Sequence, residues 1–139
     1  MKKNTKKGFT LVELLVVIAI LAILATVSIV GYTAFINRAH ESNAKTEAAQ
    51  IKSTITSYTM TGEEYELATV TSGESTTKYT VKADLYVYAN GTKVAAAVTT
   101  DLGELNDDFK GLPGTLTVNA SGRLVYTSAE ESSINVTIE

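Results

Sequence analysis

The residue with the most unusual chemistry in this sequence is Glu13, because it lies in a long apolar stretch. The 22 residues from Phe9 to Val30 contain four polar side chains and no base, and only Glu13 ionises. A carboxylate at membrane depth costs about 2.5–3.5 kcal/mol, so such a residue usually has a function. Glu13 therefore either reaches the headgroups from a shallow position or pairs with a cation of another molecule, because no later base of this chain is placed to reach it.

The second candidate site is a cluster of four acids in the C-terminal half, namely Asp101, Glu104, Asp107 and Asp108. Carboxylate oxygens are calcium ligands, but this spacing lacks the alternating ligands and the central glycine of a calcium loop. A short acidic helix or loop on the surface is the preferred interpretation, and a calcium site is the alternative.

No other group of residues is typical of catalysis. Cysteine is absent, and no serine or glycine pattern matches a nucleophile elbow or a phosphate-binding loop. The single histidine, His40, stands among polar residues on a predicted helix, so we expect it to be solvated. Tyr86 and Tyr88 predict either a contact surface or simple cross-strand packing. We therefore expect neither an enzyme nor a bound cofactor.

The apolar stretch is long enough to cross a membrane as a helix. At roughly 1.5 Å per residue it spans about 33 Å. A secretory signal peptide is excluded because the stretch is too long, contains Glu13 and lacks an Ala-x-Ala site. Four lysines precede the stretch, namely Lys2, Lys3, Lys6 and Lys7. They predict that the N-terminus stays in the cytoplasm.

The residues around Glu13 carry a resemblance to a known family. Lys-Lys-Gly-Phe-Thr-Leu-Val-Glu-Leu, residues 6–14, resembles the processing site of type IV prepilins and secretion pseudopilins. A short basic leader ends in Gly8, Phe9 follows, and a glutamate is the fifth residue of the mature chain. The resemblance covers roughly residues 2–36. It implies cleavage between Gly8 and Phe9 by a prepilin peptidase, N-methylation of Phe9, and pairing of Glu13 with the Phe9 amine of a neighbouring subunit.

This resemblance implies a structural subunit of a type IV pilus, acting in adhesion or surface motility. Its partners would be other pilin subunits, the prepilin peptidase, the assembly platform protein and the assembly ATPase. The precursor is expected to be a single-pass protein of the cytoplasmic membrane with its head outside, and the assembled form an extracellular pilus. An exported domain without cysteine is compatible with a Gram-positive host, so we expect a Gram-positive major pilin.

Two alternatives remain open at this stage. The first is a pseudopilin or minor pilin of a type II secretion or competence DNA-uptake system, which the N-terminal motif does not separate from a major pilin. Some secretion pseudopilins hold calcium in a loop comparable to the acidic cluster. The second is a membrane-tethered enzyme or binding protein, in which Glu13 would be replaceable.

Removal of residues 1–8 changes the net charge. Four of the 12 bases lie in this leader, so 8 bases remain against 15 acids and the formal charge falls from −3 to −7. A negative protein repels nucleic acid and anionic lipid surfaces, and we expect no specific nucleic-acid partner.

A second helical segment continues beyond the apolar stretch, and Gly62 is expected to end it near residue 60. Many bacterial pilins have a glycine where this chain has Ala22 and a proline where it has Val30, and both weaken a helix. We therefore expect a helix that is continuous over residues 22–30. An apolar residue recurs every three or four positions and predicts one buried stripe, made of Ala44, Ala48, Ile51, Ile55 and Tyr58.

Residues 78–89 alternate between apolar and polar side chains and predict one long strand. Asn90-Gly91 then predicts a type I′ turn and a hairpin. The expected pairs are Val87 with Val94, Leu85 with Ala96, and Ala83 with Val98. Residues 63–77 are expected to form an irregular crossing from helix to sheet.

A second hairpin is predicted around Gly122, which we expect in the left-handed conformation. A three-residue turn ending there pairs Val118 with Leu124 and Leu116 with Tyr126. Residues 134–138 alternate again and predict a last strand.

The predicted fold is α+β, with a helix over about 9–60 whose second half packs on a four- or five-stranded antiparallel sheet. The expected divisions are a cleaved leader at 1–8, a transmembrane or filament-core helix at 9–30, its amphipathic continuation at 31–61, and a sheet head at 62–139.

Overall fold

The structure is a computed structural model that describes residues 8–98, 102 and 104–139. The chain forms two compact units, one ending at Arg38 and one running from Ala39 to Glu139, which we call the head. Six residues of the predicted sites lie wholly or partly outside the described residues: Lys2, Lys3, Lys6, Lys7, Asp101 and the side chain of Glu104.

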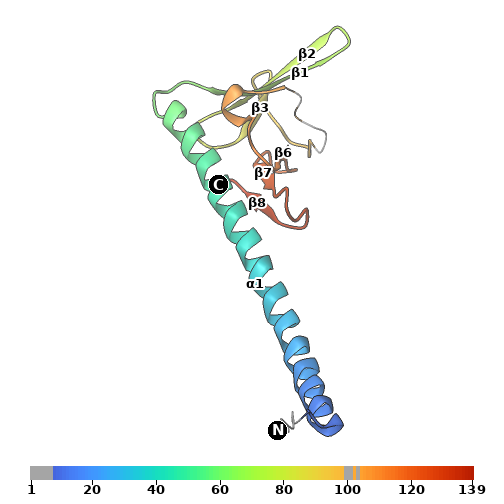
Figure 1. Cartoon of the computed structure of the whole chain (residues 1–139). Coiled ribbons are helices and arrows are strands. Elements are labelled where there is room, and N and C mark those ends of the chain that lie inside the picture. The colour runs from blue at the N-terminus through green and yellow to red at the C-terminus, as the bar shows by residue number, and fades with distance from the viewer. Residues whose placement is uncertain (1–7, 99–101, 103) are drawn as a thin grey trace, which may run out of the picture. The chain divides into compact units, whose positions relative to one another are not determined.

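A single helix, α1, runs from Leu11 to Thr59 (Figure 1). Residues 22–30 are helical throughout, which confirms the expected continuity for the isolated chain. The helix ends as predicted at Gly62, whose φ of 84° is the left-handed conformation that glycine adopts at little cost. The Gly62 N–H donates to the Thr59 carbonyl at 3.1 Å, which satisfies one of the last free carbonyls of the helix.

The buried stripe of α1 agrees with the prediction except at its end. Ala44, Ala48, Ile51 and Ile55 are all at most 4% exposed, but Tyr58 is 51% exposed and Thr59 is buried in its place. The Tyr58 ring instead lies at the margin of the core, edge-on to the Tyr65 ring with 5.2 Å between centroids.

The first sheet has five strands in the order β4-β3-β2-β1-β5. Its first hairpin joins β1 (Tyr65–Ser72) to β2 (Ser75–Val81), so the predicted irregular crossing at 63–77 is wrong. A bulge between Glu66 and Ala68 puts Leu67 and Ala68 both in the core. Two adjacent buried residues break the alternation by which a strand is recognised in a sequence.

The predicted long strand at 78–89 is also wrong, because the chain folds back on itself within it. β2 ends at Val81, β3 covers Val87–Ala89, and the two pair antiparallel with Val81 opposite Val87. The turn between them places Leu85 at φ 59°, a conformation that non-glycine residues adopt rarely.

The Asn90-Gly91 turn is confirmed, but its hairpin is short. Both residues have positive φ, 47° and 83°, as a type I′ turn requires. β4 is only Thr92–Lys93, and the Val94 N–H donates to the Val87 carbonyl at 2.9 Å, which confirms that pair. The pairs expected further along do not form, since Leu85 lies in the turn and Val98 bridges to Val118 in the other sheet.

The second sheet has the order β6-β7-β8 and agrees with the sequence prediction. β6 (Thr115–Val118) pairs with β7 (Leu124–Thr127) in the expected register, and Gly122 has φ 79°. β8 (Asn135–Thr137) pairs with β7 as the last strand. The short strand β5 (Glu104–Leu105) and the 3-10 helix η1 (Asp107–Phe109) precede this sheet.

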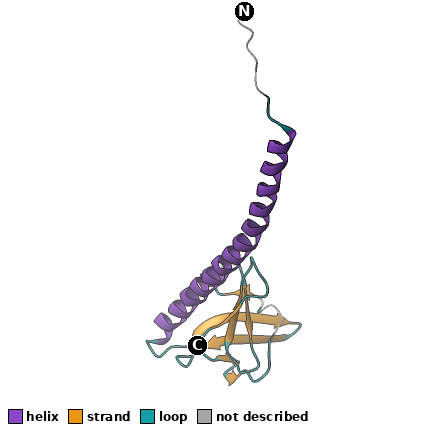
Figure 2. Cartoon of the chain, turned by 90° about the horizontal axis from the view of Figure 1, so that it is seen from below, coloured by secondary structure: helices purple, strands orange, loops and turns teal. Residues whose placement is uncertain are grey.

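The core of the head lies between the strands and residues 39–59 of α1, which Figure 2 shows beside the orange strands. The α+β class is therefore confirmed, and the described residues form eight strands in two sheets in place of the four or five expected. The largest fully buried side chains are Tyr126, Ile51, Ile55, Leu67, Leu102, Leu124, Val81, Val87 and Val118.

Candidate functional site

The start of α1 holds Glu13 in a reciprocal pair of hydrogen bonds with Thr10. The Thr10 backbone N–H donates to Glu13 Oε2 at 2.9 Å, and the Glu13 backbone N–H donates to Thr10 Oγ1 at 3.2 Å. This is a capping box, in which the residue before the helix and the third residue inside it satisfy each other's backbone N–H groups. The carboxylate therefore has a local partner that the sequence interpretation missed, although Thr-x-x-Glu before an apolar run is a known signature.

Gly8 and Phe9 precede the helix and are fully accessible. A side chain added at Gly8 would meet nothing within 4 Å, and its φ is not in the left-handed region. Neither packing nor backbone conformation of the described chain thus requires glycine there. Phe9 is 92% exposed, so the peptide bond between the two residues is open to an enzyme.

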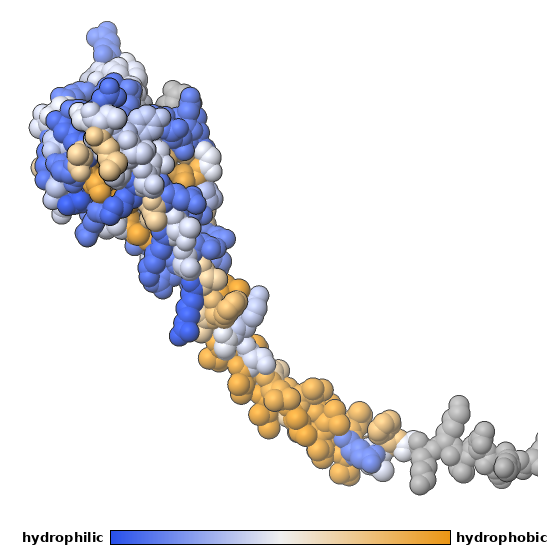
Figure 3. Space-filling view, turned by 90° about the vertical axis from the view of Figure 1, so that its left-hand side faces the viewer, coloured by the Kyte–Doolittle hydropathy of each residue, from blue (hydrophilic) through white to orange (hydrophobic). Residues whose placement is uncertain are grey.

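From Leu11 to Val30 the helix exposes apolar side chains on every side. None of its large apolar residues is less than 48% exposed, and Figure 3 shows apolar surface covering this stretch. The helix is long and apolar enough to cross a membrane. A helix that is apolar all round needs an apolar environment from outside, either lipid or other helices.

The other polar side chains of this stretch are satisfied by the helix itself. Thr26 Oγ1 donates to the Ile23 carbonyl at 2.7 Å, and Ser28 Oγ donates to the Leu24 carbonyl at 2.8 Å. Such bonds remove the cost of a hydroxyl in an apolar medium. The charge of Glu13 is then the one strongly polar feature that this surface, from Gly8 to Val30, presents to another molecule.

The acidic cluster is not arranged as a metal site in the part that the structure describes. Asp107 pairs with Lys110 Nζ at 2.6 Å, which lowers the pKa of that carboxyl. Asp108 accepts a hydrogen bond from Tyr65 Oη at 2.9 Å. Burial and this carboxylate raise the pKa of the Tyr65 phenol. Among the described residues, no three acids, histidines or cysteines converge to hold a metal ion.

His40 was expected to be solvated, and it instead contacts a residue of the C-terminal sheet. Its Nδ1 lies against Glu130 Oε2, and the His40 side chain is 27% exposed. This pair links α1 to the loop after β7. The sequence did not predict this contact, because 90 residues separate His40 from Glu130.

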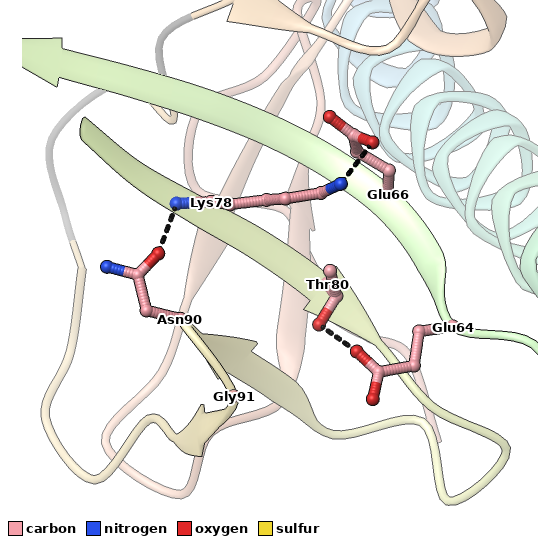
Figure 4. A pocket seen from close by; sticks show the side chains of 6 residues that line it. All are labelled: Glu64, Glu66, Lys78, Thr80, Asn90 and Gly91. Atoms are coloured by element: carbon pink, nitrogen blue, oxygen red, sulfur yellow. Dashed lines mark hydrogen bonds and ion pairs between the residues drawn. The ribbon is translucent and has the colours of Figure 1, made fainter.

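The outer face of the first sheet has a shallow concavity lined by charged residues of β1 and β2 (Figure 4). Each acid there is paired, since Lys78 Nζ lies 2.6 Å from Glu66 and Lys82 Nζ lies 3.0 Å from Glu64. These cations hold the pKa of both carboxyls below its usual range. The concavity is therefore lined by solvent-exposed ion pairs, and neither of its carboxylates is left unpaired to bind a ligand.

Comparison with known proteins finds similarity in the N-terminal part of the chain. Residues 3–29 match the family model described as the prokaryotic N-terminal methylation motif. The chain is also 39% identical over 62 residues to the type IV major fimbrial protein FimA of Dichelobacter nodosus. The N-terminal segment of the chain is thus similar to that of a type IV fimbrial protein and carries the methylation motif.

The likeness to this pilin relative is partial. The alignment covers 45% of the chain and 40% of the fimbrial protein, so the chain matches less than half the length of that relative. No solved structure matches the chain. The sequence similarity is therefore limited to part of the chain, and the head is described by its own contacts.

Proposed function

We propose that this chain is the major structural subunit of an extracellular type IV pilus. Prepilin peptidase cleaves between Gly8 and Phe9, Phe9 is N-methylated, and the apolar helix enters the filament core. The observation that supports this most is the stretch from Leu11 to Val30, which is exposed and apolar on every side with one acid at its start. The name of the matched relative, a major fimbrial protein, favours the major subunit.

The apolar helix lies first in the membrane and then among the helices of the filament core. Before assembly residues 9–30 span the cytoplasmic membrane, with the leader lysines inside and the head outside. Removal of the leader eliminates four positive charges that hold the precursor in this orientation. The platform protein and the ATPase then transfer the helix from lipid to other helices, which exchanges one apolar contact for another at little net cost.

Glu13 sets the position at which each subunit joins its neighbour in the filament. The capping box uses Oε2, and no hydrogen bond to Oε1 is present in the described chain. After cleavage the Phe9 amine of a neighbouring subunit is the cation that can meet it. A subunit added without that cation would bury an unpaired charge, at a cost of about 3–5 kcal/mol.

The capping box allows the charge to be tested separately from the helix cap. Glu13→Gln keeps an acceptor for the Thr10 N–H, because glutamine also forms capping boxes, but it removes the charge. Thr10→Ala is the matched control, since it loses the hydroxyl acceptor and keeps the charge. Glu13→Gln should give a processed membrane protein and no filaments, whereas Thr10→Ala should still assemble.

The measurement is electron microscopy of filaments sheared from the cell surface, with mass spectrometry of their subunit. A wild-type mass beginning at methylated Phe9 supports processing, and Gly8→Ala should accumulate the uncut precursor in the membrane. Normal filaments from Glu13→Gln would refute the role given to its charge. A chain that is found only as scarce, short filaments beside another abundant pilin would be the pseudopilin or minor pilin.

A role in adhesion or surface motility, and a Gram-positive host, belong to the same proposal. Cells lacking the chain should lose attachment or spreading on surfaces together with the filaments. Loss of protein secretion or of DNA uptake, with adhesion intact, would favour the pseudopilin or competence alternative.

A further inference from the structure

Two cations of the head lie close to one aromatic ring. Lys93 Nζ lies 3.1 Å and Arg123 Cζ lies 4.0 Å from the centroid of the Tyr86 ring. Both cations therefore contact the same ring. We call Lys93, Tyr86 and Arg123 the cation stack.

The fold holds the cation stack in place from both sheets. Tyr86 forms an isolated bridge with Arg123, and the Val87 N–H donates to the Gly122 carbonyl at 2.8 Å. Gly122 comes so close to β4 that an added Cβ would lie 2.5 Å from the Val94 carbonyl oxygen. The three side chains are therefore set by backbone contacts and not by flexible loops.

The two cations of the stack lie beside one carboxylate, that of Asp84. Asp84 accepts hydrogen bonds from the Tyr86 N–H at 3.1 Å and from Tyr88 Oη at 2.8 Å. Against the effect of burial, these bonds and the charge of Lys93 lower the pKa of the Asp84 carboxyl. One carboxylate leaves the two cations with an excess of positive charge. No ion pair joins Lys93 or Arg123 to an acid of the described chain. By contrast, four other lysines of the head each pair with one, namely Lys45, Lys78, Lys82 and Lys110.

We propose that the cation stack binds an exposed carboxylate on the head of a neighbouring copy of this chain in the filament. This inference rests on the proposed function. The processed chain carries 8 bases against 15 acids, so heads brought together repel each other unless local contacts offset the repulsion. Four exposed acids have no cation partner in the described chain and are candidates: Glu63, Glu74, Glu131 and Glu139.

A second copy fits the stack better than a free polyanion does. The net negative charge lowers the concentration of free nucleic acid or other polyanions near the head. A neighbouring head, in contrast, is held close by the helices in the filament, so a local pair of cations can act at high effective concentration. Local charge complementarity therefore favours a neighbouring head over a free polyanion as the ligand of the cation stack.

The test is a charge inversion in the full chain, Lys93→Glu with Arg123→Glu. Lys52→Glu with Arg38→Glu is the matched control, because it also replaces one lysine and one arginine at exposed sites, changes the net charge equally and breaks no ion pair of the described chain. The stack variant should be processed and reach the membrane, but give at least about tenfold fewer filaments than the control. Adding one of the candidate changes E63K, E74K, E131K or E139K should restore filaments.

The milder pair Lys93→Gln with Arg123→Gln covers the case in which the inverted head does not fold, and it should also reduce filament yield. Equal yields from stack and control variants would overturn the inference, as would failure of all four restoring changes. Normal filaments that lose binding to heparin beads would assign the stack to an external polyanion and also overturn it. If the wild-type chain forms no filaments, the proposed function fails instead.

Discussion

Tyr126 joins the C-terminal sheet to the helix, and its removal tests how the head is held together. The side chain is completely buried, and its Oη donates to Glu47 Oε2 at 2.6 Å while accepting from the Gly114 N–H at 3.0 Å. Tyr126→Phe keeps the ring and deletes both bonds. A hydrogen bond to a charged group contributes about 1.5–3 kcal/mol, and an unpaired buried N–H costs about 1–3 kcal/mol. We expect the free energy of unfolding to fall by about 3 kcal/mol.

The pKa of Tyr126 predicts a separate effect, a dependence of stability on pH. Burial, and then the Glu47 carboxylate, raise the pKa of the phenol from 10.0 to about 12. The folded head thus favours the neutral phenol, so its stabilising contribution is complete below pH 10 and is lost as pH rises from 10 to 12. Over this pH range the free energy of unfolding should fall by about 2.7 kcal/mol, which corresponds to two pKa units.

The assay is urea unfolding of the full chain in detergent, followed by near-UV circular dichroism of the tyrosines. Tyr86→Phe is the matched control, because the Tyr86 hydroxyl makes no hydrogen bond in the described chain and phenylalanine keeps the cation stack; its effect should be within about 0.5 kcal/mol. Between pH 10 and 12 the wild type should lose more stability than Tyr126→Phe. A Tyr126→Phe protein as stable as the control would refute the reasoning.

Two further predictions concern the first sheet. Gly91→Ala should destabilise the head by about 1 kcal/mol because φ at Gly91 is 83°, whereas Gly111→Ala, with negative φ and open space, should be neutral; equal melting temperatures of the two variants would contradict this. Lys78→Ala should raise the pKa of Glu66 toward its usual value, since the Lys78 ammonium lowers it. The measurement is the Glu66 carboxyl chemical shift recorded between pH 2 and 7. An unchanged pKa of Glu66 in the variant would mean that the ion pair does not form.

The parts of the fold that sequence reasoning predicted correctly are those with local causes. Gly62 ends the helix and Asn90-Gly91 forms a turn because each position needs a backbone conformation that few residues adopt. The register around Gly122 follows from matching apolar residues across a short turn. These features depend on residues close together in the chain.

The long strand at 78–89 failed for an instructive reason. Val81 and Val87 face each other across the turn, so both strands bury odd-numbered residues and the alternation continues unbroken through it. The turn itself depends on Leu85 in the left-handed region, and leucine carries no signal for that conformation. A period-two pattern thus cannot distinguish one strand from two strands joined by a turn of odd length.

The candidate site divides in the same way. Gly8, Phe9 and Glu13 could be found because they form a short contiguous motif, and the capping box at Thr10 could have been read from the same residues. The contact of Arg123 with Tyr86 and the Tyr126–Glu47 bond could not, because the partners are 37 and 79 positions apart. Only the packing of both sheets and the helix brings these partners together.

The self-satisfied hydroxyls of Thr26 and Ser28 have a consequence for any helix that packs against this part of α1. Because both hydroxyls bond to carbonyls of their own helix, a neighbour meets mainly hydrocarbon here, and packing depends on how well the apolar side chains fit together. In the filament that we propose, the angular position of each subunit is then set by that fit, by the charge of Glu13 and by the heads.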